Sequence, residues 1–241
     1  MILSIGVQKG GTGKTSTAAA LANAAAYNGQ RVLAIDCDPQ GQLSYTLSAD
    51  TTAPGSFEMI TREPYIIQTV DGVDVICASW NLSTITSSKG SARRLQQALQ
   101  PLKNEYDLII IDTPPTAGEL QYNALQASEK LIIPLQATIY DLQSLYQITD
   151  TARQIQQTNE NLTIAGFVLT QYDGRSTIAK AMRDNIIAAA DELGVPYLGE
   201  IRRAVAVQEA AALQMSLFKY APKSKPAQDY MALYKQVIQE V

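Results

Sequence analysis

A glycine-rich loop placed between an apolar run and a helical segment is the feature that most restricts how this chain can fold. The loop reads Lys9-Gly10-Gly11-Thr12-Gly13-Lys14-Thr15 and follows the apolar, β-branched run Ile2–Val7. Helical periodicity begins at its end and continues over Thr15–Tyr27. A strand, a glycine-rich loop and a helix in this order predict backbone amides that close around phosphate oxygens at the positive end of the helix.

Short apolar runs and longer helical segments alternate along the rest of the chain. The expected strands are Ile2–Val7, Val32–Asp36, Val73–Ala78, Leu108–Asp112, Leu131–Pro134, Thr163–Thr170 and Tyr197–Ile201. The expected helices are Thr15–Tyr27, Gln40–Leu47, Ala92–Leu99, Leu120–Ser128, Asp141–Thr158 and Ile178–Leu193. Runs that are apolar at every position are typical of parallel strands buried on both faces. We therefore predict an α/β fold of the P-loop NTPase type: a doubly wound, mostly parallel sheet with helices on both faces.

The length of the chain is consistent with one domain over residues 1–241. A chain of 241 residues with 46% hydrophobic residues can bury a full core, and α/β chains of this size commonly form one domain. The first predicted strand begins at Ile2, so we expect no N-terminal helix-turn-helix. The segment Asp50–Glu63 is rich in Thr, Pro, Gly and Ser, and we expect it to be a surface excursion.

Composition narrows the possible chemistry. Because the chain has no His, catalysis must rest on carboxylates, lysine, hydroxyls, backbone amides or a bound ion. Cys37 and Cys77 lack Cys-x-x-Cys spacing, which argues against a disulfide framework, a zinc site or an iron–sulfur cluster and favours the cytoplasm. We find no export signal and no apolar run near the ~18 residues of a membrane-spanning helix. A net charge of −4 argues against a generally DNA-coating surface.

Residues in and after the loop suit a nucleoside triphosphate and its metal ion. Lys14 can reach the β- and γ-phosphates, and the Thr15 hydroxyl can ligate Mg²⁺. Asp112 ends an apolar strand, so we expect its carboxylate beside the loop, where it can hold a Mg²⁺-bound water; capping of the next helix is the alternative. Gln8 departs from the usual P-loop pattern, which has Gly at this position. The predicted nucleotide-binding residues are Lys9, Gly10, Gly11, Thr12, Gly13, Lys14, Thr15 and Ser16.

Two more carboxylates end the second predicted strand. Asp36 and Asp38 have one residue between them, so in extended chain both side chains project the same way, towards the phosphates. For Asp38 the alternative is a turn-forming role before Pro39.

The loop resembles the deviant P-loop of the ParA/MinD family of ATPases, because it contains Lys9 as well as Lys14. The resemblance continues at Asp36–Gly41 and Ile111–Pro115 and spans nearly the whole chain. Two C-terminal stretches, Ile201–Ala210 and Tyr220–Lys225, are more similar to the ParA and Soj partition ATPases than to MinD.

The family resemblance implies roles for these residues and a set of ligands. The cofactors would be ATP and Mg²⁺, and the catalytic residues would be Lys9, Lys14 and Asp38, with Asp38 orienting the attacking water. Thr15, Asp36 and Asp112 would form the metal shell. Lys9 would reach the phosphates of the second subunit in a homodimer formed on ATP binding; a solvated surface lysine is the alternative. Adenine is preferred, because Thr170–Asp173 does not match the Asn-Lys-x-Asp of guanine-binding proteins.

A local basic region could contact DNA without sequence preference. Residues 201–225 contain five Lys or Arg and one Glu, enough to neutralise duplex phosphates. The DNA-binding candidates are Arg175, Arg183, Arg202, Arg203, Lys223 and Lys225. Scattered solvated charges are the alternative. ParA relatives often have a second arginine three residues after the equivalent of Arg203, and this chain has Ala206 there.

The C-terminal segment Pro226–Val241 has an apolar stripe at helical spacing and little positive charge, so we expect it to pack on its own domain rather than on a membrane. The tyrosines and Trp80 are interpreted as packing residues.

The hypothesis is a cytoplasmic ParA-type ATPase for DNA partition, associated with the nucleoid when ATP-bound and stimulated by a ParB-like partner. The alternative is a MinD-like or scaffold-type positioning ATPase acting on a protein complex or membrane site. A metabolic P-loop ligase or reductase lacks support, since no cluster-binding cysteines and no small-substrate motif are present.

Overall fold

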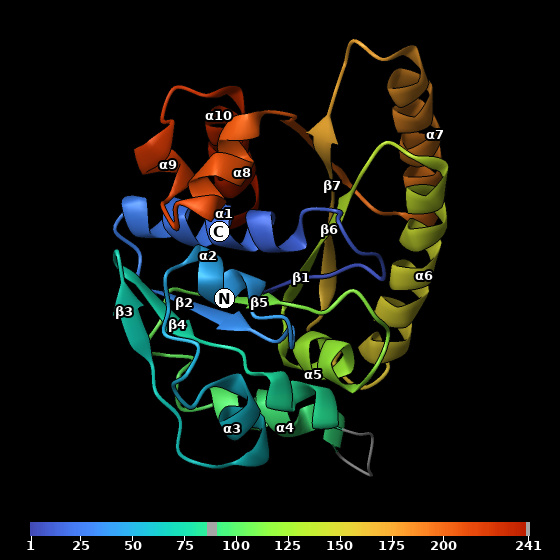
Figure 1. Cartoon of the computed structure of the whole chain (residues 1–241). Helices are drawn as coiled ribbons and strands as arrows, with labels where there is room; N and C mark the ends of the chain where they lie inside the picture. Colours follow the sequence, from blue (N-terminus) through green and yellow to red (C-terminus); the bar gives the residue numbers. More distant parts are fainter. Residues whose placement is uncertain (86–90, 240–241) are drawn as a thin grey trace.

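The computed structural model describes residues 1–85 and 91–239, and within them one eight-stranded sheet runs through the molecule (Figure 1). Its strand order is β3-β4-β2-β5-β1-β6-β7-β8. The strands are β1 (Ile2–Ile5), β2 (Val32–Asp36), β3 (Gln68–Val70), β4 (Val73–Ile76), β5 (Leu108–Asp112), β6 (Lys130–Leu135), β7 (Thr163–Tyr172) and β8 (Tyr197–Arg202). Neighbouring strands pair in parallel, except that β3 runs antiparallel to β4 at the edge. The predicted fold class is confirmed.

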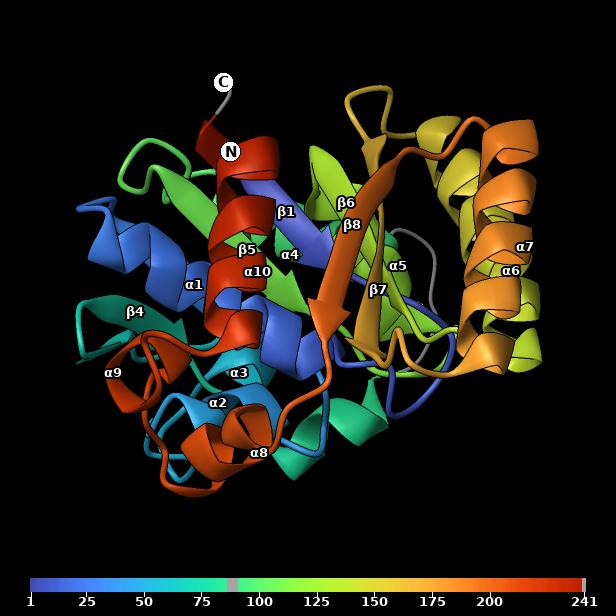
Figure 2. The same ribbon diagram turned by 90° about the horizontal axis from the view of Figure 1, so that it is seen from above.

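Helices cover both faces of this sheet. They are α1 (Lys14–Tyr27), α2 (Gln42–Thr46), α3 (Ser56–Thr61), α4 (Arg94–Leu99), α5 (Glu119–Ala127), α6 (Ile139–Gln156), α7 (Thr177–Leu193), α8 (Val205–Ala212), α9 (Leu217–Tyr220) and α10 (Lys225–Tyr234). The 3₁₀ segments η1 (Trp80–Thr84) and η2 (Ser91–Arg93) and the π-helical η3 (Lys235–Gln239) complete the described elements. One core joins the sheet to α1, α2 and α8–α10, and two cores on the other face join it to α3–α5 and to α6–α7. Figure 2 shows α6 and α7 side by side beyond β7.

The strand register gathers acidic side chains at one edge of the sheet. All five residues of β2 and all five of β5 are buried, as expected for strands covered on both faces. In this register Asp36 pairs with Asp112, and Asp112 pairs with Ile5, which ends the strand before the glycine-rich loop. In open α/β sheets ligands bind in the crevice outside the carboxyl ends of the strands, where the strand order reverses. The sheet therefore places the loop and two carboxylates at such a crevice.

The segment predicted as a surface excursion is partly built into the core, which corrects that prediction. Residues 56–61 form α3, whose Met59 and Ile60 are buried against the sheet. Gly55 precedes it and lies so close to β4 that an added Cβ would stand 1.9 Å from the carbonyl oxygen of Cys77. The Thr, Pro and Gly content predicted an exposed loop, but Gly55 instead allows its backbone to approach the backbone of Cys77 closely. The edge strand β3 and the short helices α8 and α9 were also not predicted.

The C-terminal segment packs on the domain, as predicted, over the residues that the structure describes. Tyr230, Leu233 and Tyr234 of α10 are buried, and α10 packs across α1 (Figure 2). The end of the predicted stripe at Val241 lies outside the described residues. None of the described helices combines the length and apolar character that a membrane span requires.

The packing role predicted for aromatic residues is confirmed for some of them and wrong for others. Tyr230 and Tyr234 are about 2% and 1% exposed, whereas Trp80 is 68% exposed and Tyr140 is 71% exposed. Trp80 stands in η1, just after β4, at the same edge of the sheet as Asp38. The sequence shows the abundance of these residues but not that η1 and the start of α6 turn them outward.

Candidate nucleotide and magnesium site

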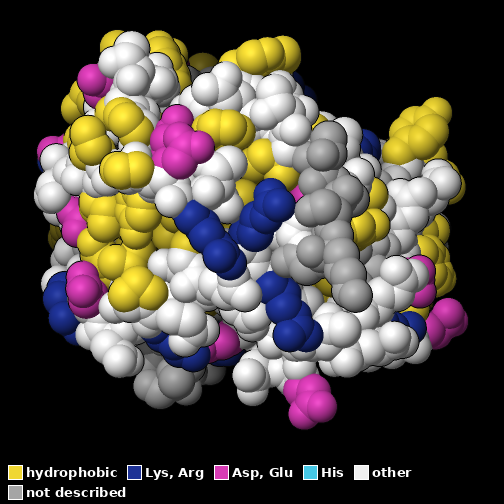
Figure 3. Space-filling view, turned by 90° about the horizontal axis from the view of Figure 1, so that it is seen from below, with side chains coloured by type: hydrophobic (Ala, Val, Ile, Leu, Met, Phe, Trp, Pro, Cys, Tyr) yellow, Lys and Arg dark blue, Asp and Glu magenta, His cyan; other side chains and the backbone are white. Residues whose placement is uncertain are grey.

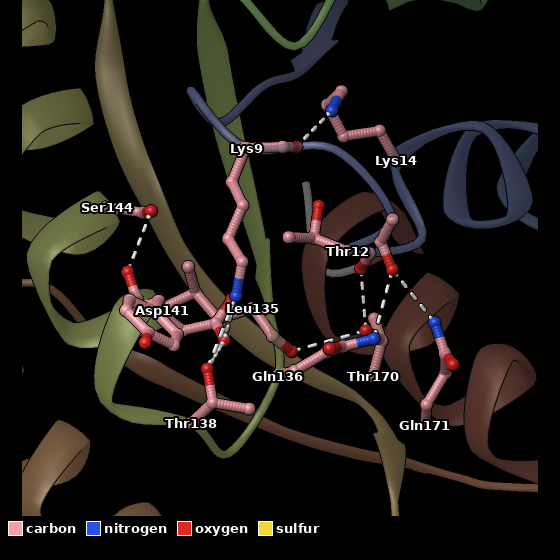
Figure 4. A network of polar contacts seen from close by, with 12 residues as sticks. Lys9, Thr12, Lys14, Leu135, Gln136, Thr138, Asp141, Ser144, Thr170 and Gln171 are labelled. Carbon is pink, nitrogen blue, oxygen red and sulfur yellow. Dashed lines mark hydrogen bonds and ion pairs between the residues drawn. The ribbon is translucent and has the colours of Figure 1, made fainter.

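The glycine-rich loop connects β1 to α1 and is held by side chains from the other half of the sheet (Figure 4). The carbonyl oxygen of Gly11 accepts hydrogen bonds from the side-chain amides of Gln136 and Gln171, both at 3.0 Å. The Thr170 hydroxyl donates to the carbonyl oxygen of Thr12 at 2.6 Å. These hydrogen bonds restrain the loop carbonyl oxygens. The loop amides then remain available to form a phosphate-binding concavity.

Glycine is required at the end of this loop. Gly13 has a φ of 84°, in the left-handed region, and it caps α1 without a side chain. A Cβ there would also meet the Thr170 side chain at 3.3 Å. The first-turn amides of an α-helix lack partners within the helix, so the start of α1 forms a positive helix end suited to an anion.

Lys14, in the first turn of α1, is 7% exposed and turns back over the loop. Its Nζ donates to the carbonyl oxygen of Lys9 at 2.7 Å. Burial lowers the pKa of Lys14, and the nearby carboxylates of Asp112 and Asp38 partly oppose this change. The structure therefore holds a desolvated cation where phosphate charge would be neutralised.

Asp112 fits the role of a magnesium ligand by its contacts. It is fully buried at the end of β5, and its Oδ2 accepts a hydrogen bond from the Thr15 hydroxyl at 2.7 Å. Its Oδ1 has no hydrogen-bond partner within the described chain. Burial raises the pKa of Asp112 well above its ordinary value, and the neighbouring Asp36 adds to this effect. A buried carboxylate oxygen without a donor, beside a hydroxyl, is a place that a divalent cation would stabilise.

Across residues 1–85 and 91–239, no three Cys, Asp or Glu side chains converge closely enough to hold a metal by themselves. A Mg²⁺ ion here would take only one or two protein ligands and complete its shell with phosphate oxygens and water, which is how Mg²⁺ usually binds beside nucleotides. The donor set of Thr15 and Asp112 meets that description.

Asp36 and Asp38 have different hydrogen-bond partners at the end of β2. Asp36 is fully buried, and its oxygens accept from Ser44 and from the backbone amide of Asp38. Burial raises the pKa of Asp36 to about 6, although these hydrogen bonds oppose the rise. Asp38 lies in the turn after β2, where its Oδ1 accepts from the Gln40 amide at 3.0 Å. The metal role of Asp36 and the water-orienting role of Asp38 stay predictions.

Asp38 lines a groove of about 400 Å³ at the carboxyl edge of the sheet. Trp80 and Leu82 of η1 line it, as do the segment after β5 that begins at Pro114 and the first turn of α5 up to Gln121. The groove offers a partly apolar space next to a carboxylate that could orient water.

Lys9 points towards its own chain rather than into solvent (Figure 4). Its Nζ lies 2.6 Å from Asp141 Oδ2 and 3.2 Å from the Thr138 hydroxyl. The Asp141 side chain is fully buried, whereas the Lys9 side chain is 25% exposed. Sequence reasoning missed Asp141 as a functional candidate, because a partner 132 positions away in the chain leaves no local signal.

A pocket of about 670 Å³ adjoins the loop on the β7 and β8 side. Its lining residues are Gly13, Ser16, Thr170–Arg175, Ile201–Val205, Val207, Gln208, Lys225 and Tyr230. Its position next to the phosphate loop suits the base and ribose of a nucleotide. Asp173 is held within it by Arg175, whose Nε and Nη2 each donate at 2.9 Å, and this pair lowers the pKa of Asp173 to about 2.

The six basic DNA-binding candidates do not form one free patch. Arg202 is held by Asp229, with Nη2 2.6 Å from Oδ1, and Arg183 pairs with Asp184. Arg175 is paired with Asp173, as described above. Arg203, Lys223 and Lys225 are exposed. Half of the predicted set is therefore neutralised in part by carboxylates of the same chain.

The face on which α3 and α4 lie also presents basic side chains, which gather near its centre (Figure 3). Arg62, directly after α3, and Arg93, the last residue of η2 before α4, are exposed, and Arg93 donates to the carbonyl oxygen of Thr158 at 3.4 Å. The sequence analysis did not single out these arginines, because they are separated along the chain.

Comparison with known proteins gives matches over nearly the whole chain. The family model described as AAA domain matches residues 1–164. The sporulation initiation inhibitor protein Soj of Bacillus subtilis is 34% identical over 256 residues, covering 98% of this chain and 97% of that protein. The chromosome partitioning protein ParA of Caulobacter vibrioides is 33% identical over 252 residues, covering 98% and 93%.

Two solved structures are similar in fold over at least nine-tenths of both chains. The cell division ATPase MinD of Pyrococcus furiosus has a TM-score of 0.81 and 27% identity, covering 100% of this chain and 99% of that one. A cobyrinic acid a,c-diamide synthase of Mycobacterium smegmatis, with bound ATP analogue and magnesium, has a TM-score of 0.81 and 31% identity, covering 95% and 91%.

Proposed function

Because this chain belongs to the ParA/MinD family of P-loop ATPases, we propose that it binds ATP with Mg²⁺, hydrolyses the ATP, and thereby drives DNA partition. The observation that carries the ATPase proposal is the contact between Thr15 and Asp112, which brings a hydroxyl and a buried carboxylate together beside the phosphate loop. The ATP analogue and magnesium bound to the related Mycobacterium protein support the same choice of ligands.

The residues of the site divide the work of phosphoryl transfer. The loop amides and Lys14 bind the phosphates, and Thr15 and Asp112 hold Mg²⁺, as their contacts favour. When bound, Mg²⁺ would neutralise developing charge on the phosphate oxygens. Asp38 orients water from the groove that it lines. Because positioning and electrostatics supply most of the catalysis in phosphoryl transfer, a chain without His can perform it.

We also propose that ATP binding joins two copies through the edge of the sheet that carries the loop. Ile139 and Tyr140, at the start of α6, are strongly exposed beside Lys9. Exposed apolar residues around a charged site favour a surface that a partner covers. In the dimer Lys9 would leave Asp141 and reach the phosphates of the second copy.

The proposed cellular role is DNA partition, with the chain in the cytoplasm and on the nucleoid when ATP-bound. Support comes from the names of the Soj and ParA relatives and from the exposed Arg203, Lys223 and Lys225. A ParB-like partner would stimulate hydrolysis. The second candidate, a positioning ATPase acting on a protein complex or membrane site, is favoured by the pairing of Arg175, Arg183 and Arg202 with carboxylates of the same chain.

Purified protein with ATP tests the ATPase proposal directly. We expect slow Mg²⁺-dependent phosphate release and a dimer in light scattering with a non-hydrolysed ATP analogue but not with ADP. Lys14→Ala should lose both, whereas Lys180→Ala, on the exposed surface of α7, should keep both. Equal phosphate release by wild type and Lys14→Ala would refute the assignment of the site.

A further inference from the structure

Ser44 of α2 joins the ends of two strands beneath the groove. It is fully buried, and its hydroxyl accepts a hydrogen bond from the backbone amide of Ala78, after β4, at 2.9 Å. The hydroxyl donates to Asp36 Oδ2 at 2.8 Å, and the Ser44 backbone amide donates to the same oxygen at 2.8 Å. A serine hydroxyl has a single proton to donate. Because the hydroxyl oxygen accepts from the Ala78 amide, its own proton is free to point to Asp36.

The other oxygen of Asp36 holds the backbone of Asp38. Asp36 Oδ1 accepts from the Asp38 amide at 3.1 Å, and the turn is closed by the Gly41 amide on the Asp38 carbonyl at 2.9 Å. Both oxygens of Asp36 are thus directed at groups of its own chain. Asp112 differs, because its Oδ1 has no partner among the described residues.

We propose that Ser44, acting through Asp36, is a positioning residue that sets where the Asp38 carboxylate stands in the groove. This inference rests on the proposed ATP hydrolysis, and it assigns Asp36 to the support of Asp38 rather than to the metal shell. The order of contacts is Ala78 amide, Ser44 hydroxyl, Asp36 carboxylate and Asp38 amide, and every link lies within hydrogen-bond distance.

Loss of the Ser44 hydroxyl would change turnover more than nucleotide affinity. Without it the Ala78 amide loses its acceptor and Asp36 Oδ2 loses one of two donors. The turn that carries Asp38 would then be less restrained. The phosphate loop is held by Thr170, Gln136 and Gln171. None of these three side chains hydrogen-bonds to Ser44, Asp36 or Asp38. A displacement of about 1 Å in a positioning group can reduce the rate by about 100-fold.

The test compares Ser44→Ala with Ser44→Thr and with a matched control, Ser48→Ala. Ser48 follows α2 and donates to the Gln214 carbonyl on the surface. For Ser44→Ala we expect kcat to fall at least about tenfold, while KM and the dissociation constant of a fluorescent ATP analogue stay within about twofold. Ser44→Thr keeps a hydroxyl and should recover most of kcat, and Ser48→Ala should match wild type.

Hydrogen exchange supplies a readout that does not depend on turnover. Amides of residues 36–43 should exchange faster in Ser44→Ala than in wild type or Ser48→Ala, and exchange in the phosphate loop should not change. If Ser44→Ala does not fold, Asp36→Asn provides the second variant. Its side-chain NH2 group is a donor and would face another donor, either the Ser44 hydroxyl or the backbone amide of Asp38. We expect the same fall in kcat and the same faster exchange from it.

The outcomes separate this inference from the proposed function. An unchanged kcat together with unchanged exchange in Ser44→Ala would overturn the inference, and so would an equal loss of nucleotide affinity and turnover. A wild-type chain that releases no phosphate would refute the ATPase proposal. In that case, faster exchange confined to residues 36–43 in Ser44→Ala would still support the role of Ser44 in positioning Asp38.

Discussion

Lys9 Nζ lies 2.6 Å from the buried carboxylate of Asp141, so the lysine that we propose to act on a second subunit is held by its own chain. The two residues come from the phosphate loop and the start of α6, and Thr138 donates a further hydrogen bond to the same carboxylate. Lys9 must break this ion pair to reach another copy. In the proposed dimer, this contact would therefore oppose association until bound nucleotide supplies a better partner for Lys9.

Weakening this ion pair should favour the dimer. In Asp141→Asn the side chain keeps its shape but loses its charge, so Lys9 is released at lower energetic cost. We expect the dissociation constant of the dimer with a non-hydrolysed ATP analogue to fall by about threefold to tenfold, measured by analytical ultracentrifugation. Asp150→Asn, on the exposed side of α6, is the control and should match wild type. Weaker dimerisation in Asp141→Asn would show that Asp141 supports the dimer instead.

The contact between Thr15 and Asp112 predicts a selective effect on magnesium. Thr15→Ala removes the hydroxyl that lies 2.7 Å from Asp112, whereas Thr15→Ser keeps it. We expect the Mg²⁺ concentration for half-maximal binding of a fluorescent ATP analogue to rise about tenfold in Thr15→Ala and less than threefold in Thr15→Ser. Equal Mg²⁺ requirements in the two variants would exclude the hydroxyl as a ligand.

Burial of Asp36 predicts how stability changes with pH. Its pKa is raised to about 6 in the folded chain, against about 3.9 for an exposed Asp, so the folded state keeps this proton to a higher pH. The stabilisation is complete below pH ~4 and is lost as pH rises through 6. Relative to Asp36→Asn, the free energy of unfolding of the nucleotide-free wild type should fall by up to about 3 kcal/mol between pH 4 and 7.

Urea unfolding of both proteins at several pH values checks this expectation, because other carboxylates contribute alike to each. Parallel pH profiles for wild type and Asp36→Asn would contradict it.

The two adjacent arginines should differ in their effect on DNA. Arg202 is tied to Asp229 at 2.6 Å, whereas Arg203 is exposed. We expect Arg203→Ala to reduce the salt dependence of binding to a random duplex by about one unit of slope, the value for one lost phosphate contact. Arg202→Ala should instead lower Tm, because Asp229 loses its partner. A larger loss of DNA binding in Arg202→Ala than in Arg203→Ala would contradict this prediction and show that the Arg202–Asp229 ion pair opens when DNA binds.

Much of the fold follows from local sequence signals. Runs such as Leu108–Ile111 are apolar at every position, which is typical of a strand in a sheet covered on both faces. The order of strand, glycine-rich loop and helix likewise fixes where phosphate would bind. Asp112 was found at the predicted edge for the same reason, since a strand that ends in a carboxylate brings it to the carboxyl end of the sheet.

Contacts between distant segments were beyond such reasoning. Nothing near Lys9 indicates Asp141, and nothing near Ser44 indicates that its hydroxyl joins Asp36 to Ala78. α3 was missed because the close approach of Gly55 to Cys77 depends on tertiary packing, which overrides the local turn signals. The prediction for Asp141 depends on the contact with Lys9, and the proposed role of Ser44 depends on its contacts with Asp36 and Ala78.

In the proposed function ATP switches this chain into a state that binds DNA, and fluorescence anisotropy of a random-sequence duplex measures that switch. Protein is titrated with ADP or with a non-hydrolysed ATP analogue, each with Mg²⁺, at two salt concentrations, alongside Lys14→Ala and Lys9→Ala. We expect tight, salt-sensitive binding only with the ATP analogue and only in the wild type. No binding by a protein that does form the nucleotide-dependent dimer would contradict the partition role and favour a positioning ATPase.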